Sequence, residues 1–223
     1  SSHPNLQNIP SRTEMGRSIR KAFVAEPGFI FYAADYSQIE LRVLAHLSND
    51  QSLVQAFKKG MDIHKQTAAV IFDVEYDLET KEQRAQAKTI NFATLYGQGS
   101  FSLANQLGVS REQAQGFIDD YFERFGDVSN FFGVQVQKAQ QEGFVETLMG
   151  RRRYVPELKS KQWNMRQFGE RVAQNSPIQG TAADLIKKAM IGIANKLALV
   201  QSETRMLLLS LIHISEPTRR TPI

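Results

Sequence analysis

Apolar residues recur at helical spacing along most of this chain after Ser37. Side chains three and four positions apart lie on one face of a helix, so a recurring apolar residue at that spacing marks a buried face. The pattern predicts helices over residues 39–47, 51–59, 63–72, 81–96, from 110 toward 125, 162–174 and 181–199. We therefore expect a mostly helical protein.

Polar residues at the starts of these segments sharpen their limits. Thr80 with Gln83, and Ser110 with Gln113, have the form of capping boxes that open helices. Gly97 is placed to end the helix that Thr80 opens, since glycine is common just after a helix. Pro177 and Gly180 are expected to separate the last two helices.

Three segments depart from the helical pattern. Residues 29–34 form a short aromatic and apolar run that predicts a buried strand ending at Asp35. Residues 143–148 and 151–156 flank Met149-Gly150 and predict a hairpin. Residues 1–20, rich in Pro, Asn, Ser and Arg, are expected to be irregular.

Composition narrows the class of protein only slightly. The chain is 42% hydrophobic, and 27 Lys and Arg against 23 Asp and Glu leave a net charge of +4, a mild bias toward anionic partners. It has no Cys, which excludes disulfides, thiolate metal sites and a cysteine nucleophile. No apolar run approaches the ~20 residues of a membrane-spanning helix. We expect a cytoplasmic monomer with no membrane partner.

The helix predicted over residues 81–96 carries Arg84, Lys88, Phe92 and Tyr96 at intervals of four. Such residues share one face, so two cations lie at one end of a stripe and two aromatic rings at the other. This order suits a nucleoside triphosphate, because the cations match phosphates and the rings match sugar and base. The alternative is a solvated basic turn beside two core aromatics.

A second cluster follows the predicted strand. A carboxylate such as Asp35 at a strand end is a suitable ligand for Mg²⁺ in phosphoryl transfer, but it is also an ordinary turn residue. Glu40 lies three residues after Ser37 and fits a capping box as well as a site role.

Segments 35–42 and 84–97 together resemble motifs A and B of family A DNA polymerases, the bacterial DNA polymerase I type. The resemblance extends from residues 4–10 through 62–64 to 179–184. It implies a DNA-directed DNA polymerase that adds deoxynucleotides to a primer 3′ end. The implied fold is α+β, a palm with an antiparallel sheet interrupted by mostly helical fingers, with residues 1–50 as palm, 51–140 as fingers and 141–208 returning to palm.

The resemblance also implies roles for single residues. Asp35 would be one of two catalytic aspartates that hold two Mg²⁺ ions, and the Tyr36 carbonyl would be a further ligand. Lys88 would donate a proton to the leaving pyrophosphate. Glu40 would exclude ribonucleotides by crowding the sugar 2′ position. The implied nucleotide-binding set is Arg20, Gln38, Glu40, His64, Arg84, Lys88, Phe92 and Tyr96. His64, taken without the resemblance, is equally well explained as a structural histidine.

The implied DNA contacts are Arg12, Arg171, Asn175 and Gln179, which would reach primer and template through the minor groove. Arg151, Arg152 and Arg153 are left outside the site. A basic hairpin that contacts the DNA backbone and a solvated charged turn explain them equally well.

The resemblance stops near Leu208, where the family continues with a strand turn that carries a His-Asp-Glu triplet, motif C. Residues 209–223 contain no Asp. We expect them to be a non-family tail, the palm to be truncated and the chain alone to be inactive. The alternatives are a non-catalytic fragment that binds primer-template and nucleotide, and an unrelated nucleotide hydrolase. The sequence contains no Gly-x4-Gly-Lys-Ser/Thr loop to bind phosphates, which argues against the hydrolase.

Overall fold

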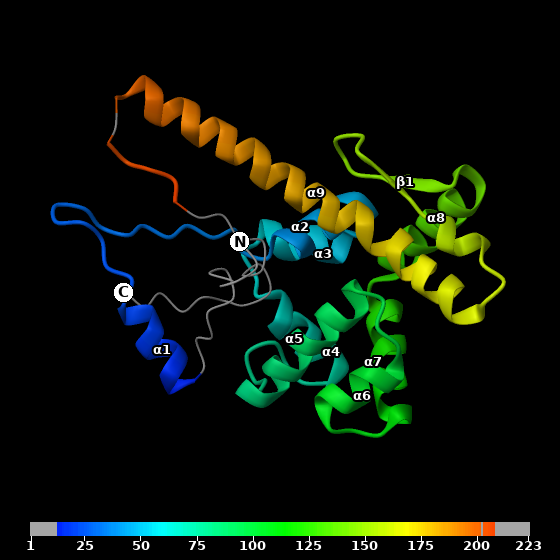
Figure 1. Ribbon diagram of the computed structural model, residues 1–223. Helices are drawn as coiled ribbons and strands as arrows, with labels where there is room; N and C mark the ends of the chain where they lie inside the picture. Colours follow the sequence, from blue (N-terminus) through cyan, green and yellow to red (C-terminus); the bar gives the residue numbers. More distant parts are fainter. Residues whose placement is uncertain (1–12, 202, 208–223) are drawn as a thin grey trace. The chain divides into compact units, whose positions relative to one another are not determined.

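The computed structural model describes residues 13–201 and 203–207, and the chain divides into two compact units. Residues 1–39 and 189–223 form the first unit, and Glu40–Lys188 form the second. The second unit is largely helical and contains most of the residues that the sequence singles out (Figure 1). Each unit is described by itself below.

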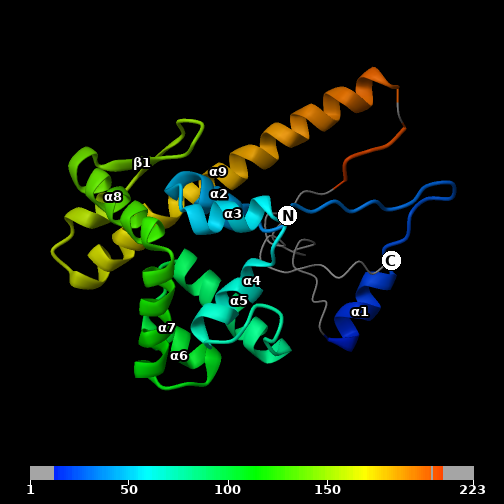
Figure 2. The same cartoon turned by 180° about the vertical axis from the view of Figure 1, so that it is seen from behind.

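After α1, seven helices of the described residues precede the hairpin, and apart from the first residue of α2 they all belong to the second unit. They are α2 (Ile39–Ser48), α3 (Gln51–Lys58), α4 (Ile63–Ile71), α5 (Lys81–Leu95), α6 (Ser100–Leu107), α7 (Arg111–Arg124) and α8 (Gly126–Glu142). The predictions for α3, α4, α5 and α7 are confirmed, whereas α6 and α8 have no counterpart in the predicted helices. α4 packs along α5, and α6 packs along α7, as both views show (Figures 1 and 2).

Both predicted capping boxes on α5 and α7 are formed. The Thr80 hydroxyl accepts from the Gln83 amide at 3.1 Å, and the Gln83 side chain accepts from the Thr80 amide at 2.8 Å. Ser110 and Gln113 repeat the arrangement at the start of α7. These side chains satisfy amide groups that a helix start otherwise leaves without partners. The local sequence therefore determines where α5 and α7 begin.

The helices enclose an apolar core in the second unit. Its largest fully buried side chains come from α2 through α8, the hairpin that follows and α9 (Trp163–Leu199). They include Leu41, Leu44, Leu53, Ile63, Ile90, Leu95, Leu103, Tyr121, Phe125, Val128, Val145 and Ile178. Burial of these side chains is the main term that stabilises the unit. One face of α5 belongs to this core.

The predicted hairpin is formed by β1 (Phe144–Glu146) and β2 (Arg152–Tyr154), which pair antiparallel. Its turn is bound to α9: the Leu148 amide donates to the Thr181 hydroxyl at 2.9 Å. Arg151 donates to the Gly180 carbonyl at 2.9 Å and to the Asp184 carboxylate at 2.8 Å. The short 3-10 helix η2 (Pro156–Lys159) then leads to α9.

α9 runs without interruption from Trp163 to Leu199, so the prediction of two helices separated at Pro177 and Gly180 is wrong. Proline inside a helix removes a backbone hydrogen bond and costs about 3 kcal/mol. Here the buried Pro177 packs in the core, and the hairpin turn bonds to the helix directly after it. These tertiary contacts offset the local preference for a break.

The first unit departs from prediction twice. Residues 14–21 form helix α1 (Glu14–Lys21), capped by the Thr13 hydroxyl, where an irregular segment was expected. The strand predicted over residues 29–34 is not formed, and Ile30 and Tyr32 are 85% and 86% exposed. A strand needs a neighbour to complete its backbone hydrogen bonds, and no described residue pairs with this segment.

The α+β prediction with a mostly helical lobe is confirmed by the described residues, which combine helices with a two-stranded antiparallel sheet. Among the helices formed by residues 13–201, none has the length and apolarity that crossing a membrane requires.

Candidate functional site

The predicted stripe on α5 is present. Arg84, Lys88, Phe92 and Tyr96 are each half-buried and follow one another at intervals of about one helical turn. The rings of Phe92 and Tyr96 are stacked, with centroids 6.1 Å apart and planes inclined by 21°. The face therefore has a cationic end and a flat aromatic end, as the sequence indicates.

An aspartate that the sequence did not single out holds the cationic end. The Asp62 Oδ2 atom accepts from Arg84 Nη2 at 2.6 Å and from Nε at 2.9 Å. Its Oδ1 atom accepts from the amides of His64 and Lys65, which makes Asp62 the N-cap of α4. Burial raises the pKa of Asp62, but the hydrogen bonds and charge of Arg84 outweigh it and leave the pKa below its ordinary value.

His64 is 2% exposed and lies against the same face of α5. Its Nδ1 atom is 3.0 Å from the side-chain nitrogen of Asn91, and its ring centroid is 5.9 Å from that of Phe92. Burial lowers the pKa of His64 to about 4, because the charged imidazolium loses its hydration. Asp62 opposes this shift, while Arg84 and Lys88 reinforce it. His64 is therefore a neutral imidazole at pH 7.

Glu40 is buried at the aromatic end of the stripe. The Tyr96 hydroxyl donates to Glu40 Oε2 at 2.6 Å, which joins α2 to the end of α5. Burial raises the pKa of Glu40 above its ordinary value, and the hydrogen bond from Tyr96 opposes that shift. The pKa of Tyr96 is also raised, mainly by burial and then by the adjacent carboxyl. The pair fixes the position of both side chains.

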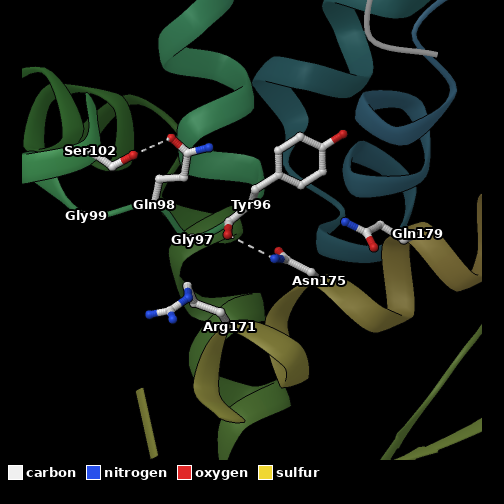
Figure 3. A pocket seen from close by; sticks show the side chains of 8 residues that line it. All are labelled: Tyr96, Gly97, Gln98, Gly99, Ser102, Arg171, Asn175 and Gln179. Carbon is white, nitrogen blue, oxygen red and sulfur yellow. Dashed lines mark hydrogen bonds between the residues drawn. The ribbon is translucent and has the colours of Figure 1, made fainter. Parts of the chain in front are cut away.

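A cleft of about 570 Å³ opens where α5 ends and α9 passes (Figure 3). Asn175 closes one side by donating to the Tyr96 carbonyl at 2.9 Å. Gly97 adopts a φ of +62°, and an added Cβ would lie 2.9 Å from the Gln174 side chain and 3.1 Å from that of Arg171. The remaining lining comes from Gln98, Gly99, Ser102 and Gln179.

Three of the four predicted DNA contacts lie on α9 beside this cleft. Arg171 and Asn175 are half-buried, and Gln179 is exposed. Their spacing of four places them along one face of the helix, as their labels in Figure 3 show. Arg12 lies outside the described residues. The structure therefore brings Arg171, Asn175 and Gln179 to the same cleft as Tyr96.

The hairpin arginines have partners within the chain. Arg151 bonds to Asp184 and Gly180, and Arg152 bonds to Glu146 at 3.0 Å. Two of the three hairpin arginines therefore have hydrogen-bond partners within the chain itself.

Four of the predicted site residues that the structure describes belong to the first unit. Arg20 is half-buried in the last turn of α1, and Asp35 and Tyr36 are exposed in an irregular segment. Gln38 has a positive φ of 53°, which is uncommon for a residue with a side chain. Within residues 13–201 and 203–207, no three His, Cys, Asp or Glu side chains gather to hold a metal ion.

Sequence reasoning missed Asp62, Asn91 and the close approach at Gly97. Asp62 stands directly before an apolar-periodic helix, which is an N-cap signal that was available. Asn91 is a polar residue between Ile90 and Phe92, and its full burial follows only from the packing of α4 on α5. No local signal indicates which residue faces Gly97.

The face of α5 has a cationic end and an aromatic end, and it lies beside the cleft at α9. The family model for DNA polymerase family A matches residues 1–213. The chain belongs to DNA polymerase family A. The resemblance inferred from its motifs is confirmed.

Individual family A proteins are similar over nearly the whole chain. DNA polymerase I of Bacillus subtilis (strain 168) is 53% identical over 209 residues, which are 93% of this chain and 24% of that protein. DNA polymerase I of Pseudomonas aeruginosa is 50% identical over 208 residues, 93% of this chain and 23% of that protein. The chain therefore spans about a quarter of the length of these relatives.

A solved structure described as the POL domain of Pol1 from M. smegmatis, in complex with DNA primer-template and dNTP, matches with a TM-score of 0.86. It is 45% identical in sequence, and the match covers 94% of this chain and 37% of that one. The family A fold is therefore common to both.

Proposed function

We propose that this chain forms the nucleotide-binding part of a DNA-directed DNA polymerase, which adds deoxynucleotides to a primer 3′ end. The observation that carries the proposal is the stripe on α5. In one compact unit it combines two cations, two stacked rings and the buried side chains of His64 and Glu40. Membership in DNA polymerase family A supports the same function.

Arg84 and Lys88 are proposed to bind the triphosphate of the incoming nucleotide. Arginine binds phosphate oxygens with a planar fork and lysine with a mobile point charge. Arg84 is already oriented by Asp62 through its Nε and Nη2 atoms. Lys88 is further proposed to donate a proton to the leaving pyrophosphate, as a general acid does.

Phe92 and Tyr96 are proposed to receive the sugar and the base. Their stacked rings present a continuous flat surface. The hydrogen bond from Tyr96 holds Glu40 in one position, so Glu40 acts as a rigid barrier to a ribose 2′-hydroxyl. This arrangement selects deoxynucleotides by rejection of the larger sugar.

The face of α9 beside the cleft is proposed to contact primer and template. Arg171, Asn175 and Gln179 are polar donors of the kind that read minor-groove acceptors without sequence preference. The bond between Asn175 and the Tyr96 carbonyl links this face to the nucleotide site. The M. smegmatis domain, described in complex with primer-template and dNTP, supports both partners.

Magnesium is proposed as the cofactor of the intact enzyme. Asp35 with its carboxylate and Tyr36 with its carbonyl would be ligands, and two ions, when bound, stabilise charge on the transferred phosphoryl group. Arg20 and Gln38 are also proposed to contact the incoming nucleotide.

Titration of the 223-residue chain with dATP by calorimetry tests the nucleotide site. Lys88→Ala should raise the Kd about tenfold or more, since a hydrogen bond to a charged phosphate is lost. Lys58→Ala, which removes an exposed lysine of α3, is the matched control and should leave the Kd unchanged. Equal affinities for Lys88→Ala and the unaltered chain would contradict the proposal.

In an intact polymerase that contains this chain, the same Lys88→Ala change should lower kcat by about 10²-fold or more, the range of general acid catalysis. An unchanged rate of primer extension would exclude the proton-donor role while leaving the binding role open to the calorimetric test.

A further inference from the structure

Three buried polar side chains connect α4 to α5 behind the proposed triphosphate site. His64, Thr67 and Asn91 are 2%, 1% and 0% exposed. The Thr67 hydroxyl donates to Asn91 Oδ1 at 3.1 Å, and Asn91 Nδ2 lies 3.0 Å from His64 Nδ1. Buried polar groups need partners, and this chain of two hydrogen bonds gives each of the three side chains at least one.

The direction of the bonds follows from the chemistry of the groups. An amide nitrogen has hydrogens and no acceptor site, so Asn91 Nδ2 can only donate to His64 Nδ1. The reverse orientation of the Asn91 amide would make the Thr67 hydroxyl an acceptor. Its own hydrogen would then be buried without an acceptor, because among the described residues the hydroxyl donates to Asn91 alone.

A ring nitrogen that accepts a hydrogen bond carries no proton. We propose that Asn91, oriented by Thr67, is a positioning residue that fixes His64 as the neutral tautomer with its proton on Nε2. The imidazole then presents an N–H donor on the side away from Asn91. This step rests on the proposed function: the N–H donor is directed at a phosphate oxygen of the incoming nucleotide. The other tautomer would present a lone pair to that oxygen.

The surroundings of the ring agree with a neutral donor. Phe92 packs against it with centroids 5.9 Å apart, which excludes water from that side. The charged groups that act on it are Asp62 at the start of α4, and Arg84 and Lys88 of α5. Two of these three are cations. A neutral N–H therefore adds a phosphate contact without placing a third positive charge beside them.

Nitrogen-15 NMR of the 223-residue chain at pH 7 tests the tautomer directly. The chain has four histidines, so the His64 ring signals can be assigned from their loss in His64→Gln. We expect the nitrogen coupled to both ring protons, Nε2, to show the shift of a protonated nitrogen, and Nδ1 that of an acceptor. A protonated Nδ1, in either the neutral or the charged ring, would overturn the inference whether or not nucleotide binds.

Asn91→Asp tests the cause. A carboxylate only accepts, so it should draw the proton to Nδ1 and change the tautomer or charge of His64. The Kd for dATP should rise about tenfold, the factor for one lost hydrogen bond to a charged phosphate. Thr94→Val is the matched control: Thr94 is also buried on α5, but its hydroxyl donates to the carbonyls of Ile90 and Asn91 and interacts with Tyr121, not with His64. It should leave the His64 signals and the Kd unchanged.

The outcomes separate the two proposals. If the unaltered chain shows the Nε2 proton but does not bind dATP, the proposed function fails and the tautomer assignment stands. If dATP binds and Asn91→Asp leaves either the tautomer or the Kd unchanged, the positioning role of Asn91 is refuted. Should Asn91→Asp fail to fold, the spectrum of the unaltered chain still decides the tautomer.

Discussion

Two titratable side chains from neighbouring helices, His64 of α4 and Glu40 of α2, lie beside the stripe on α5 and are shifted toward their neutral forms. Burial lowers the pKa of His64 to about 4 and raises that of Glu40, because in both cases the charged form loses hydration. A nucleotide site with neutral His64 relies on Arg84 and Lys88 for its positive charge. The burial of individual side chains therefore decides which residues around this face carry a charge.

The depressed pKa of His64 predicts how stability depends on pH. The unfolded chain binds a proton near pH 6.5 and the folded chain only near pH 4, so the folded state is penalised as pH falls through this interval. The loss of unfolding free energy between pH 7 and pH 4 should be about 3 kcal/mol from this residue. Urea denaturation at both pH values measures it.

His64→Gln provides the comparison, since glutamine does not titrate. The variant should lose about 3 kcal/mol less than the unaltered chain over the same interval, while the contributions of carboxylates remain common to both. An equal loss in the two proteins would show that His64 is not held neutral.

At the scale of elements, Asp62 links the start of α4 to the cationic end of α5. Asp62→Ala should lower the free energy of unfolding by about 1–2 kcal/mol, because it removes the cap of α4 together with the partner of Arg84. Asp62→Asn keeps a capping oxygen and should cost less. Thermal and urea denaturation distinguish them, and equal effects would mean that the cap contributes nothing.

Two glycines of α9 should respond in opposite ways to alanine. At Gly180 a Cβ would lie 2.5 Å from Thr147 Cγ2, so Gly180→Ala should destabilise the chain by about 1–3 kcal/mol through overpacking against the hairpin. At Gly192 nothing lies within 4 Å. Gly192→Ala should stabilise by about 0.5–1 kcal/mol through helix propensity. Urea denaturation of both variants measures the two effects. If Gly180→Ala leaves the free energy of unfolding unchanged, the hairpin must shift to make room for the added Cβ.

At the scale of the whole molecule, the chain should bind its partners without completing the reaction. No Asp follows Asp184 in the sequence, and Asp35 is the single aspartate proposed to hold metal. Loss of one of two bridging carboxylates removes transition-state stabilisation. Incubated with primer-template, dNTPs and Mg²⁺, the 223-residue chain should give negligible primer extension.

Binding of the same primer-template, followed by fluorescence anisotropy, should persist and weaken as salt rises, since phosphate contacts release counterions. An intact family A polymerase serves as the positive control for extension. Robust extension by the 223-residue chain would show that the residues proposed here suffice for the reaction.

Predictions from sequence succeeded where the signal is local. The capping boxes at Thr80 and Ser110 and the hairpin around Met149 depend on residues a few positions apart. Predictions failed where distant contacts outweigh a local preference. The break expected at Pro177 is absent because the hairpin turn bonds to the helix there. The strand expected over residues 29–34 has no neighbouring strand among the residues that the structure describes.

By itself, the sequence determined the stripe of Arg84, Lys88, Phe92 and Tyr96, since four-residue spacing on a helix places side chains on one face whatever surrounds it. Its motifs also indicated the family. Only the tertiary structure decided the partners of this stripe: Asp62 on Arg84, the buried ring of His64 and the carboxyl of Glu40 on Tyr96. The reason is physical, because helical periodicity is a property of one segment, whereas burial and hydrogen bonding depend on which other helices pack against it.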